Sequence, residues 1–378
     1  MPEDLTPGVS PFDRAAAARL PAEPLSRHVA ARPTRLWRRP LALAVLVLVA
    51  GAALGAAGFA AEQHSFVWRP SVSATSDGGW RITGSAGLRP VAPVIAGDRL
   101  VWGQGAYTCV LDLGSGETHV VGVAPHGTSI WPPSAGERYV AWIESPKANG
   151  VRATLWVYDT RRGRRQSFAV GPDAATTAVS GDVVVWFDLG PDGIPRVVAL
   201  DMDSSRRSIL AEGPEIDYPV LADDGVVGWL ERGASGSAPS VVLKDMEKGA
   251  ATTVPLATDG SGLSVGDIQL GGRALLWTLQ SSTTTRLVAF DLDTGATTIV
   301  AQGLIENPAI DGTVVLWTTG EGASGSCVVR GRRLDGGAEF DVGRPAAWPQ
   351  SLAVGSGWAV WAFDEGTWTY LETARLGQ

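Results

Sequence analysis

Short apolar runs recur along most of the chain, and turns rich in glycine separate them. From about residue 90 onward, one run in each period ends in tryptophan, as in RLVW, YVAW and VVVW. Runs of four to eight residues with many β-branched side chains predict strands. The tryptophans that end these runs are Trp102, Trp142, Trp186, Trp229, Trp277, Trp317 and Trp361. Their mean spacing of about 43 residues predicts a repeated structural unit.

A period of this length accommodates four short strands with their turns, which is typical of a β-propeller blade. The unit at 267–303 contains four such runs, IQLGG, RALLWTL, TRLVAF and TTIVAQG. We therefore predict an all-β fold over residues 80–378, a seven-bladed β-propeller of four-stranded blades. Rings of six or eight blades are the alternatives.

The last unit, from residue 351 onward, supplies only three strands before the chain ends. The segment 80–85, WRITGS, precedes the first complete unit and has the position of a fourth strand. We expect this N-terminal strand to close the ring by pairing with residues 368–373, because closure removes free sheet edges.

Two residue types recur at fixed places in the units, and each has a packing explanation. The seven tryptophans are expected to fill the space between neighbouring blades. An aspartate begins the turn after the third strand in five units, where its carboxylate can accept backbone N–H groups. These aspartates are Asp112, Asp159, Asp201, Asp245 and Asp291.

Residues 41–61 form an uncharged apolar run of twenty-one residues, long enough as a helix to cross a hydrocarbon core of about 30 Å. Five arginines between residues 27 and 39 precede it, so the N-terminus is expected to stay cytoplasmic. We predict a disordered cytoplasmic tail at 1–40, a signal-anchor transmembrane helix at 41–61, a linker at 62–79 and an extracytoplasmic propeller. A cleaved secretory signal ending near 58–61 is the competing interpretation.

Composition narrows the possible partners. The formal net charge is −8 and lysine occurs at only three positions, which gives no basic track for a nucleic-acid backbone. Four histidines offer little material for a zinc site. Cys109 and Cys327 occupy the same strand register in units one and six, with unit seven between them. They are therefore expected to lie too far apart for a disulfide and to remain buried thiols.

The unit combines an inner strand that ends at glycine, a VVW run and an apolar strand that ends in D-L-x-T-G. This pattern resembles the TolB-like β-propeller repeats of extracytoplasmic proteins, and the resemblance covers residues 80–378. It implies a propeller fold. TolB propellers have six blades and a separate N-terminal domain, so seven tryptophan units behind a membrane helix put the translocation role of that family in doubt.

Strong catalytic signals are missing from the sequence, which contains no G-x-S-x-G, H-E-x-x-H, P-loop or C-x-x-C pattern. Carboxylate pairs occur at 223–224, 215/217 and 364–365. A glycosidase needs two facing acids, but these acids fall at expected turns, where a solvated surface charge is the ordinary role. Residues 188–193 and 291–293 resemble fragments of calcium loops but lack the terminal glutamate, so turn stabilisation is their expected role.

The residues at the start of each innermost strand should surround one mouth of the central channel. Aligned on the repeat, they are Ala92, Pro132, Thr176, Tyr218, Asp267, Asn307 and Gln350, with Trp131 and Trp348 nearby. Aromatic faces beside amides and a carboxylate suit sugar or peptide contacts. The predicted ligand-binding residues are Trp131, Thr176, Tyr218, Asp267, Asn307, Trp348 and Gln350, although plugging the channel is the alternative role.

These observations lead to an expected function. We predict a non-catalytic binding or scaffold propeller tethered to the cell membrane, with an envelope protein or a glycan as partner and with no enzyme activity, cofactor or metal. The alternative is a carbohydrate-binding or carbohydrate-active propeller enzyme with its acids at the channel mouth.

Overall fold

The computed structural model describes residues 70–84, 90–148, 150–233, 238–256, 264–281, 284–312, 314–321 and 326–377. The expected tail, the expected transmembrane segment and residues 62–69 of the expected linker lie outside these ranges. Among the described residues, no helix has the length and apolar character needed to cross a bilayer. The membrane anchor at 41–61 therefore stays a prediction.

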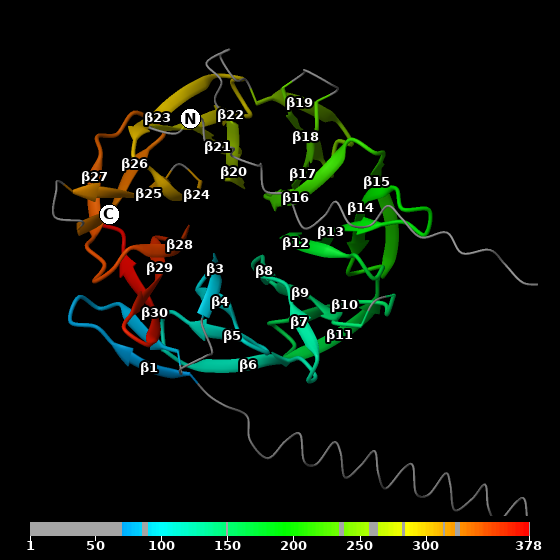
Figure 1. Cartoon of the computed structure of the whole chain (residues 1–378), viewed down its shortest axis with the longest axis horizontal. Helices are drawn as coiled ribbons and strands as arrows, with labels where there is room; N and C mark the ends of the chain where they lie inside the picture. Colours follow the sequence, from blue (N-terminus) through cyan, green and yellow to red (C-terminus); the bar gives the residue numbers. More distant parts are fainter. Residues whose placement is uncertain are drawn as a thin grey trace, which may run out of the picture. The chain divides into compact units, whose positions relative to one another are not determined.

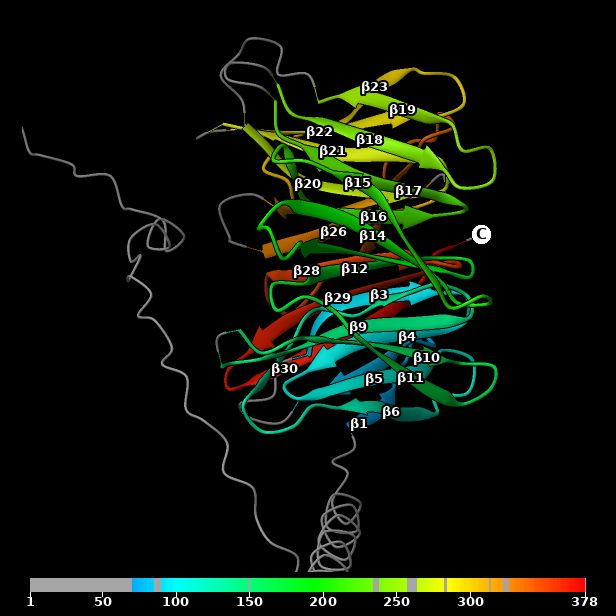
Figure 2. The ribbon, with the colours of Figure 1, turned by 90° about the vertical axis from the view of Figure 1, so that its right-hand side faces the viewer.

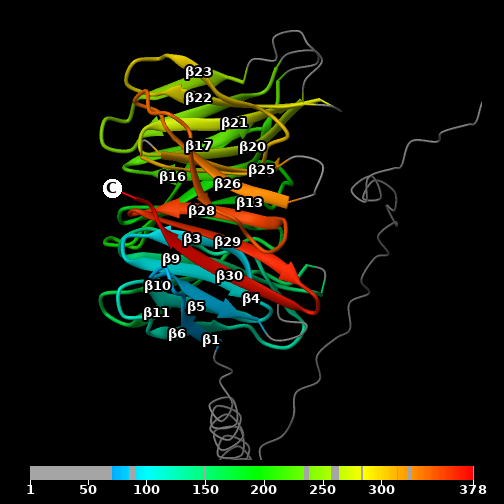
Figure 3. The same ribbon diagram turned by 90° about the vertical axis from the view of Figure 1, so that its left-hand side faces the viewer.

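Seven antiparallel sheets surround a common axis in the described part of the chain (Figure 1). Each sheet is one blade, and successive blades follow one another in chain order around the ring. Side views show the hairpin turns gathered at the two opposite faces (Figures 2 and 3). The predicted all-β, seven-bladed propeller of four-stranded blades is confirmed.

The first four blades are built as follows. Blade 1 contains β3 (Pro90–Ala96), β4 (Arg99–Gln104), β5 (Tyr107–Asp112) and β6 (Thr118–Val123). Blade 2 contains β7 (Thr128–Ile130), β8 (Ser134–Ala135), β9 (Tyr139–Pro146), β10 (Thr154–Asp159) and β11 (Arg164–Ala169). Blade 3 contains β12 (Ala175–Ser180), β13 (Val183–Leu189), β14 (Pro195–Asp201) and β15 (Arg206–Glu212). Blade 4 contains β16 (Ile216–Asp223), β17 (Val226–Glu231), β18 (Ser240–Asp245) and β19 (Ala251–Pro255).

The remaining three blades complete the ring. Blade 5 contains β20 (Ser264–Gly271), β21 (Ala274–Gln280), β22 (Thr285–Asp291) and β23 (Thr297–Gly303). Blade 6 contains β24 (Glu306–Asp311), β25 (Val314–Glu321), β26 (Ser326–Arg333) and β27 (Phe340–Gly343). Blade 7 contains β28 (Pro349–Gly355), β29 (Trp358–Glu365) and β30 (Trp368–Arg375), together with β1 (Ser71–Ala74) and β2 (Trp80–Thr83) from the start of the fold.

The ring closes where the sequence predicts. Strand β2 pairs with β30, with Ile82 opposite Leu371. The indole Nε1 of Trp80 donates a hydrogen bond of 2.8 Å to the Leu113 carbonyl, which belongs to the third turn of blade 1. Residues 71–74 of the expected linker form β1, which adds a fifth strand outside β2. The closing segment is therefore a hairpin that contacts both the last blade and the first.

The seven repeated tryptophans lie in the second strand of their blades and are all buried, at most 5% exposed. The turn aspartates also behave as expected, since Asp201 and Asp291 each accept two backbone N–H groups of their own turn. These bonds favour the charged form and hold the pKa of both carboxyls below the usual range. Cys109 and Cys327 are free and buried, as predicted.

In four blades the buried indole donates to a polar side chain two residues later on the same face of the strand. The acceptors are Gln104, Glu144, Asp188 and Glu231. Glu144 is only 6% exposed. Burial raises its pKa, against the lowering effects of the Trp142 hydrogen bond and the Arg165 charge.

This burial predicts a pH-dependent gain of stability in the E144Q variant. A folded-state pKa above the unfolded value favours folding at low pH, and that contribution is lost as pH rises through the folded pKa. Glutamine keeps an acceptor for the Trp142 indole, as Gln104 does for Trp102 in blade 1. Thermal unfolding should show E144Q more stable than the parent at pH 7.5, with the difference shrinking toward pH 4. A difference that grows toward pH 4 would contradict this sign.

Candidate functional site

The innermost strand of each blade begins at one end of the central channel and ends at the other. We call the beginning end the bulge mouth, because the innermost strands shift register there in six blades. We call the other end the turn mouth, because the turns between first and second strands form it. The two mouths differ in chemistry.

The bulge mouth contains the seven aligned positions that the sequence indicates. In the bulges lie Ala92, Thr176, Tyr218, Asp267, Asn307 and Gln350. In blade 2 the segment 131–133 instead separates β7 from β8, and it places Pro132 at this level. The register of the repeat is confirmed, whereas ligand binding by these residues stays a prediction.

Three of these residues have a left-handed backbone, namely Ala92 at φ 46°, Thr176 at φ 42° and Asn307 at φ 50°. Such a conformation is unfavourable for threonine above all, because its side chain is β-branched. Contacts between blades hold the ring in place. The Asn307 Nδ2 donates 2.9 Å to the Pro349 carbonyl, and the Gln269 Nε2 donates 2.6 Å to the Pro308 carbonyl.

The polar side chains of the bulge mouth gather mainly at blades 5 to 7. The Trp348 indole donates to Glu306, and the Gln350 amide donates to Asp364. Asp267 reaches solvent, yet protein atoms crowd it, and this desolvation raises its pKa. Trp131 lies apart from this group, in blade 2, and is 38% exposed. The predicted residues thus share one mouth but do not all converge.

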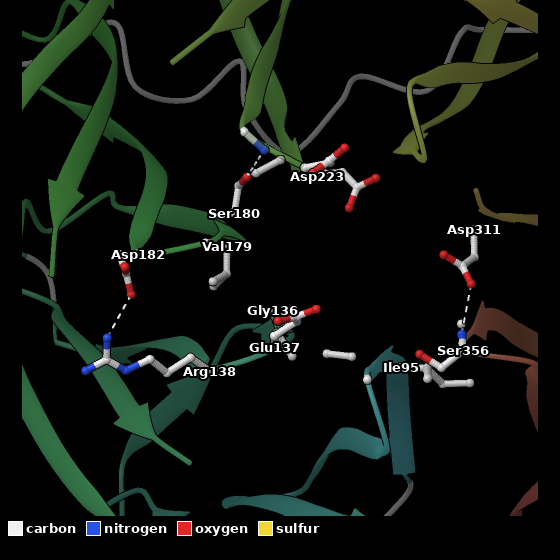
Figure 4. A pocket seen from close by; sticks show the side chains of 18 of the residues that line it. Ile95, Gly136, Glu137, Arg138, Val179, Ser180, Asp182, Asp223, Asp311 and Ser356 are labelled. Atoms are coloured by element: carbon white, nitrogen blue, oxygen red, sulfur yellow. Dashed lines mark hydrogen bonds and ion pairs between the residues drawn. The ribbon is translucent and has the colours of Figure 1, made fainter. Parts of the chain in front are cut away.

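The turn mouth holds a cavity of about 560 Å³ (Figure 4). Turns of blades 1 to 4, 6 and 7 line it. Its charged side chains are Glu137, Arg138, Arg161, Asp182, Asp223, Asp224 and Asp311. Five carboxylates thus stand against two arginines, and Arg138 is already paired with Asp182 at 3.0 Å and Asp159 at 3.1 Å.

Asp223 and Asp311 end the innermost strands of blades 4 and 6, and each accepts a backbone N–H from the next blade. Asp223 accepts from Gly272, and Asp311 accepts from Ser356 at 2.9 Å. Partial burial raises the pKa of Asp223, and the negative charges of Asp224 and Asp311 raise it further, against the lowering effect of the Gly272 N–H. Asp223 therefore retains a proton to higher pH than an ordinary aspartate does.

Blade 5 lies between the blades that carry these two carboxyls, and its first turn contains the glycines Gly271 and Gly272. A methyl group on Gly271 would lie 2.7 Å from the Ile310 carbonyl oxygen, and one on Gly272 would lie 1.9 Å from the Gly312 Cα. Both contacts are too short, so glycine is required for blades 5 and 6 to approach. Close packing thus brings Asp311 within electrostatic range of Asp223.

The sequence names Asp223 and Asp224 as a carboxylate pair but treats them as solvated, and it does not identify Asp311. The sequence does contain a signal that relates Asp223 to Asp311, because LADDG and AIDG place an aspartate at the end of the first strand in two units. Two of the other acids that the sequence names are engaged. Asp217 contacts Arg232 at 2.6 Å, and Asp364 accepts from both Gln350 and Thr369. Within the described ranges, no group of three or more His, Cys, Asp and Glu side chains could hold a metal ion.

No family model and no curated protein match the chain. Solved structures do match. An oligogalacturonate lyase in complex with manganese is 12% identical, with a TM-score of 0.54, over 82% of this chain and 96% of that one. A prolyl endopeptidase structure is 16% identical, with a TM-score of 0.52, over 72% of this chain and 46% of that one. TolB from Acinetobacter baumannii is 12% identical, with a TM-score of 0.41, over 82% and 80%.

At these identities the similarity to the lyase and endopeptidase structures establishes the fold alone, and it confirms the propeller fold that the resemblance to TolB-like repeats implies. The prediction of a non-catalytic scaffold is not supported, because the solved structures that share this fold include those of enzymes, among them a lyase and a prolyl endopeptidase. The prediction of a non-catalytic role rested on the absence of short catalytic motifs. Short motifs report loops of particular enzyme folds, whereas a propeller can assemble acids from turns that are far apart in the sequence.

Proposed function

We propose that the chain is a carbohydrate-active enzyme that cleaves a glycosidic bond in the turn mouth. One observation carries the proposal: the pKa of Asp223 is raised in a cavity that also holds the Asp311 carboxylate. Glycosidases use two carboxyl groups in this way, one protonated and one charged. The cavity volume of about 560 Å³ suits a small ligand or a few sugar units.

The two acids have separate roles in this proposal. Asp223 acts as the general acid and gives its proton to the oxygen of the leaving sugar. Asp311 is oriented by the Ser356 N–H through its Oδ2, and among the described residues its Oδ1 has no hydrogen-bond donor. That oxygen is available to activate water or to stabilise positive charge on the sugar ring.

The charge of the turn mouth defines the substrate class. Five carboxylates against two arginines repel an anionic sugar and attract a cationic one. The similar lyase is named for oligogalacturonate, an acidic oligosaccharide. We therefore propose a neutral or amino sugar as the substrate of this chain and not a uronate.

The predicted anchor at 41–61 fits this function. Arginines before the apolar run favour a cytoplasmic N-terminus. We propose that the propeller faces the outside of the membrane, where a glycan of the cell envelope would be its partner.

A panel of oligosaccharides tests the proposed function. The purified chain is incubated with neutral, amino and uronic oligosaccharides, and released reducing ends are measured between pH 4 and 8. We expect turnover of a neutral or amino sugar that falls at high pH, as Asp223 loses its proton. The D223N/D311N double variant is the negative control, because it lacks both proposed catalytic acids. Equal turnover by the double variant, a preference for uronates, or turnover of no sugar would contradict the proposal.

A further inference from the structure

Blades 5, 6 and 7 bring a second group of side chains together at the bulge mouth, at the opposite end of the channel from Asp223. We call it the bulge cluster, and its members are Asp267, Glu306, Asn307, Trp348 and Gln350. Asp267, Glu306 and Gln350 are exposed, and Asn307 and Trp348 are half-buried. All five side chains can therefore meet a ligand from solvent.

The cluster is held rigidly. Neighbouring blades are joined by the hydrogen bonds from Gln269 to the Pro308 carbonyl and from Asn307 to the Pro349 carbonyl. Asn307 has a left-handed backbone at φ 50°. Such backbone positions persist only where the surroundings impose them, and bulges are frequent next to binding sites. A ligand would meet side chains whose positions are set in advance.

Trp348 supplies the flat apolar surface of the cluster. Its indole nitrogen donates to Glu306, which fixes the ring from one edge. The ring also lies beside Gly320, where an added methyl group would sit 3.7 Å from the ring and 3.7 Å from the exposed Leu304. An indole held in this way can stack on the C–H face of a sugar ring.

The polar side chains of the bulge cluster are mainly hydrogen-bond acceptors. Asn307 and Gln350 each use the amide nitrogen within the protein, so each side-chain oxygen can accept from a ligand. Asp267 adds a carboxyl group, and crowding by the protein raises its pKa. An acceptor-rich surface beside an aromatic ring matches a ligand with many hydroxyl donors.

We propose that the bulge cluster is a saccharide-binding site, separate from the reaction site, in which a sugar ring stacks on Trp348 and its hydroxyls donate to Asp267, Asn307 and Gln350. The proposal shares the ligand class of the proposed function but does not require turnover. With a site at each end of the ring, one molecule could bind a glycan at the bulge mouth while the turn mouth cleaves its substrate.

Binding is measured by isothermal titration calorimetry with the full chain carrying D223N/D311N, so that turnover does not consume the probe. The probes are cellotetraose, maltotetraose and chitotetraose. We expect at least one to bind, and W348A to weaken that binding roughly tenfold or more. W368A is the matched control, since Trp368 is exposed on β30, outside the cluster, and it should bind as the parent does.

Q350A provides a second variant, because Gln350 is exposed and its loss should leave the fold intact. It should weaken binding severalfold, with an unchanged unfolding temperature. Binding unaffected by both W348A and Q350A, or no binding of any probe, would overturn the site. Binding that depends on Trp348, together with no turnover of any sugar by the parent chain, would sustain this site and refute the proposed reaction.

Discussion

The D223N variant is expected to lose about 10²- to 10⁴-fold in kcat while keeping its fold, which is the usual contribution of a positioned general acid. Asparagine retains an oxygen that can accept the Gly272 N–H, so the contact between blades 4 and 5 survives. It lacks the proton that the raised pKa of Asp223 keeps available. Steady-state kinetics on the sugar identified in the panel measure the loss.

D223N should lower kcat without lowering the stability of the fold. The folded-state pKa of Asp223 is raised, so its contribution to stability is present at low pH and is lost as pH rises through that pKa. At neutral pH, D223N removes the repulsion from Asp224 and Asp311 and should unfold at the same or a higher temperature than the parent. A residue that lowers stability while supporting activity is typical of a reaction site.

D293N is the matched control, because Asp293 is an exposed acid that pairs with Arg273 outside the cavity. It should keep parental kcat. If D223N kept parental kcat as well, Asp223 would be only a contact between blades, and the acid would have to be sought elsewhere.

The I82A variant is expected to lose about 2–5 kcal/mol in the free energy of unfolding. Ile82 is fully buried and packs with Leu100, Trp102 and Leu371, which come from blades 1 and 7. Truncation leaves a cavity and weakens the strand pair that closes the ring. Denaturant unfolding followed by tryptophan fluorescence measures the change.

The V72A variant tests whether the loss of stability in I82A comes from the strand pair between β2 and β30 or from the packing of the hairpin in general. Val72 lies on β1 in the same hairpin, opposite Ile82, but it is half-buried and outside the pair with β30. The free energy of unfolding should fall much less in V72A than in I82A. Equal losses in both variants would mean that the whole hairpin, and not β2 alone, closes the ring.

The repeat explains why so much of the fold could be predicted. A tryptophan in each second strand and an aspartate in five of the third turns report local needs, namely a buried surface between blades and acceptors for turn N–H groups. Such needs recur in every unit and leave a periodic signal. Strand β2 was recognised for the same reason, because the last unit lacks one strand. Strand β1 completes no unit, so no deficit in the repeat signalled it.

The candidate sites could be predicted only in part. Alignment of the units placed Asp267, Asn307 and Gln350 at equivalent bulges, because position within a repeat sets position around the axis. It could not distinguish the converging residues of blades 5 to 7 from Trp131 in blade 2. Convergence depends on side-chain direction and on contacts between blades, such as that from Trp348 to Glu306.

The period and the local strand chemistry were enough to predict the seven blades, the closing strand, the buried tryptophan frame and the two free thiols. The chemistry of the turn mouth depends instead on contacts that form only in the folded ring. Asp223 and Asp311 are eighty-eight positions apart, and they interact because Gly271 and Gly272 let blades 5 and 6 pack closely. Burial, the main cause of the raised pKa of Asp223, and the charge of Asp311 both act only after the ring has formed.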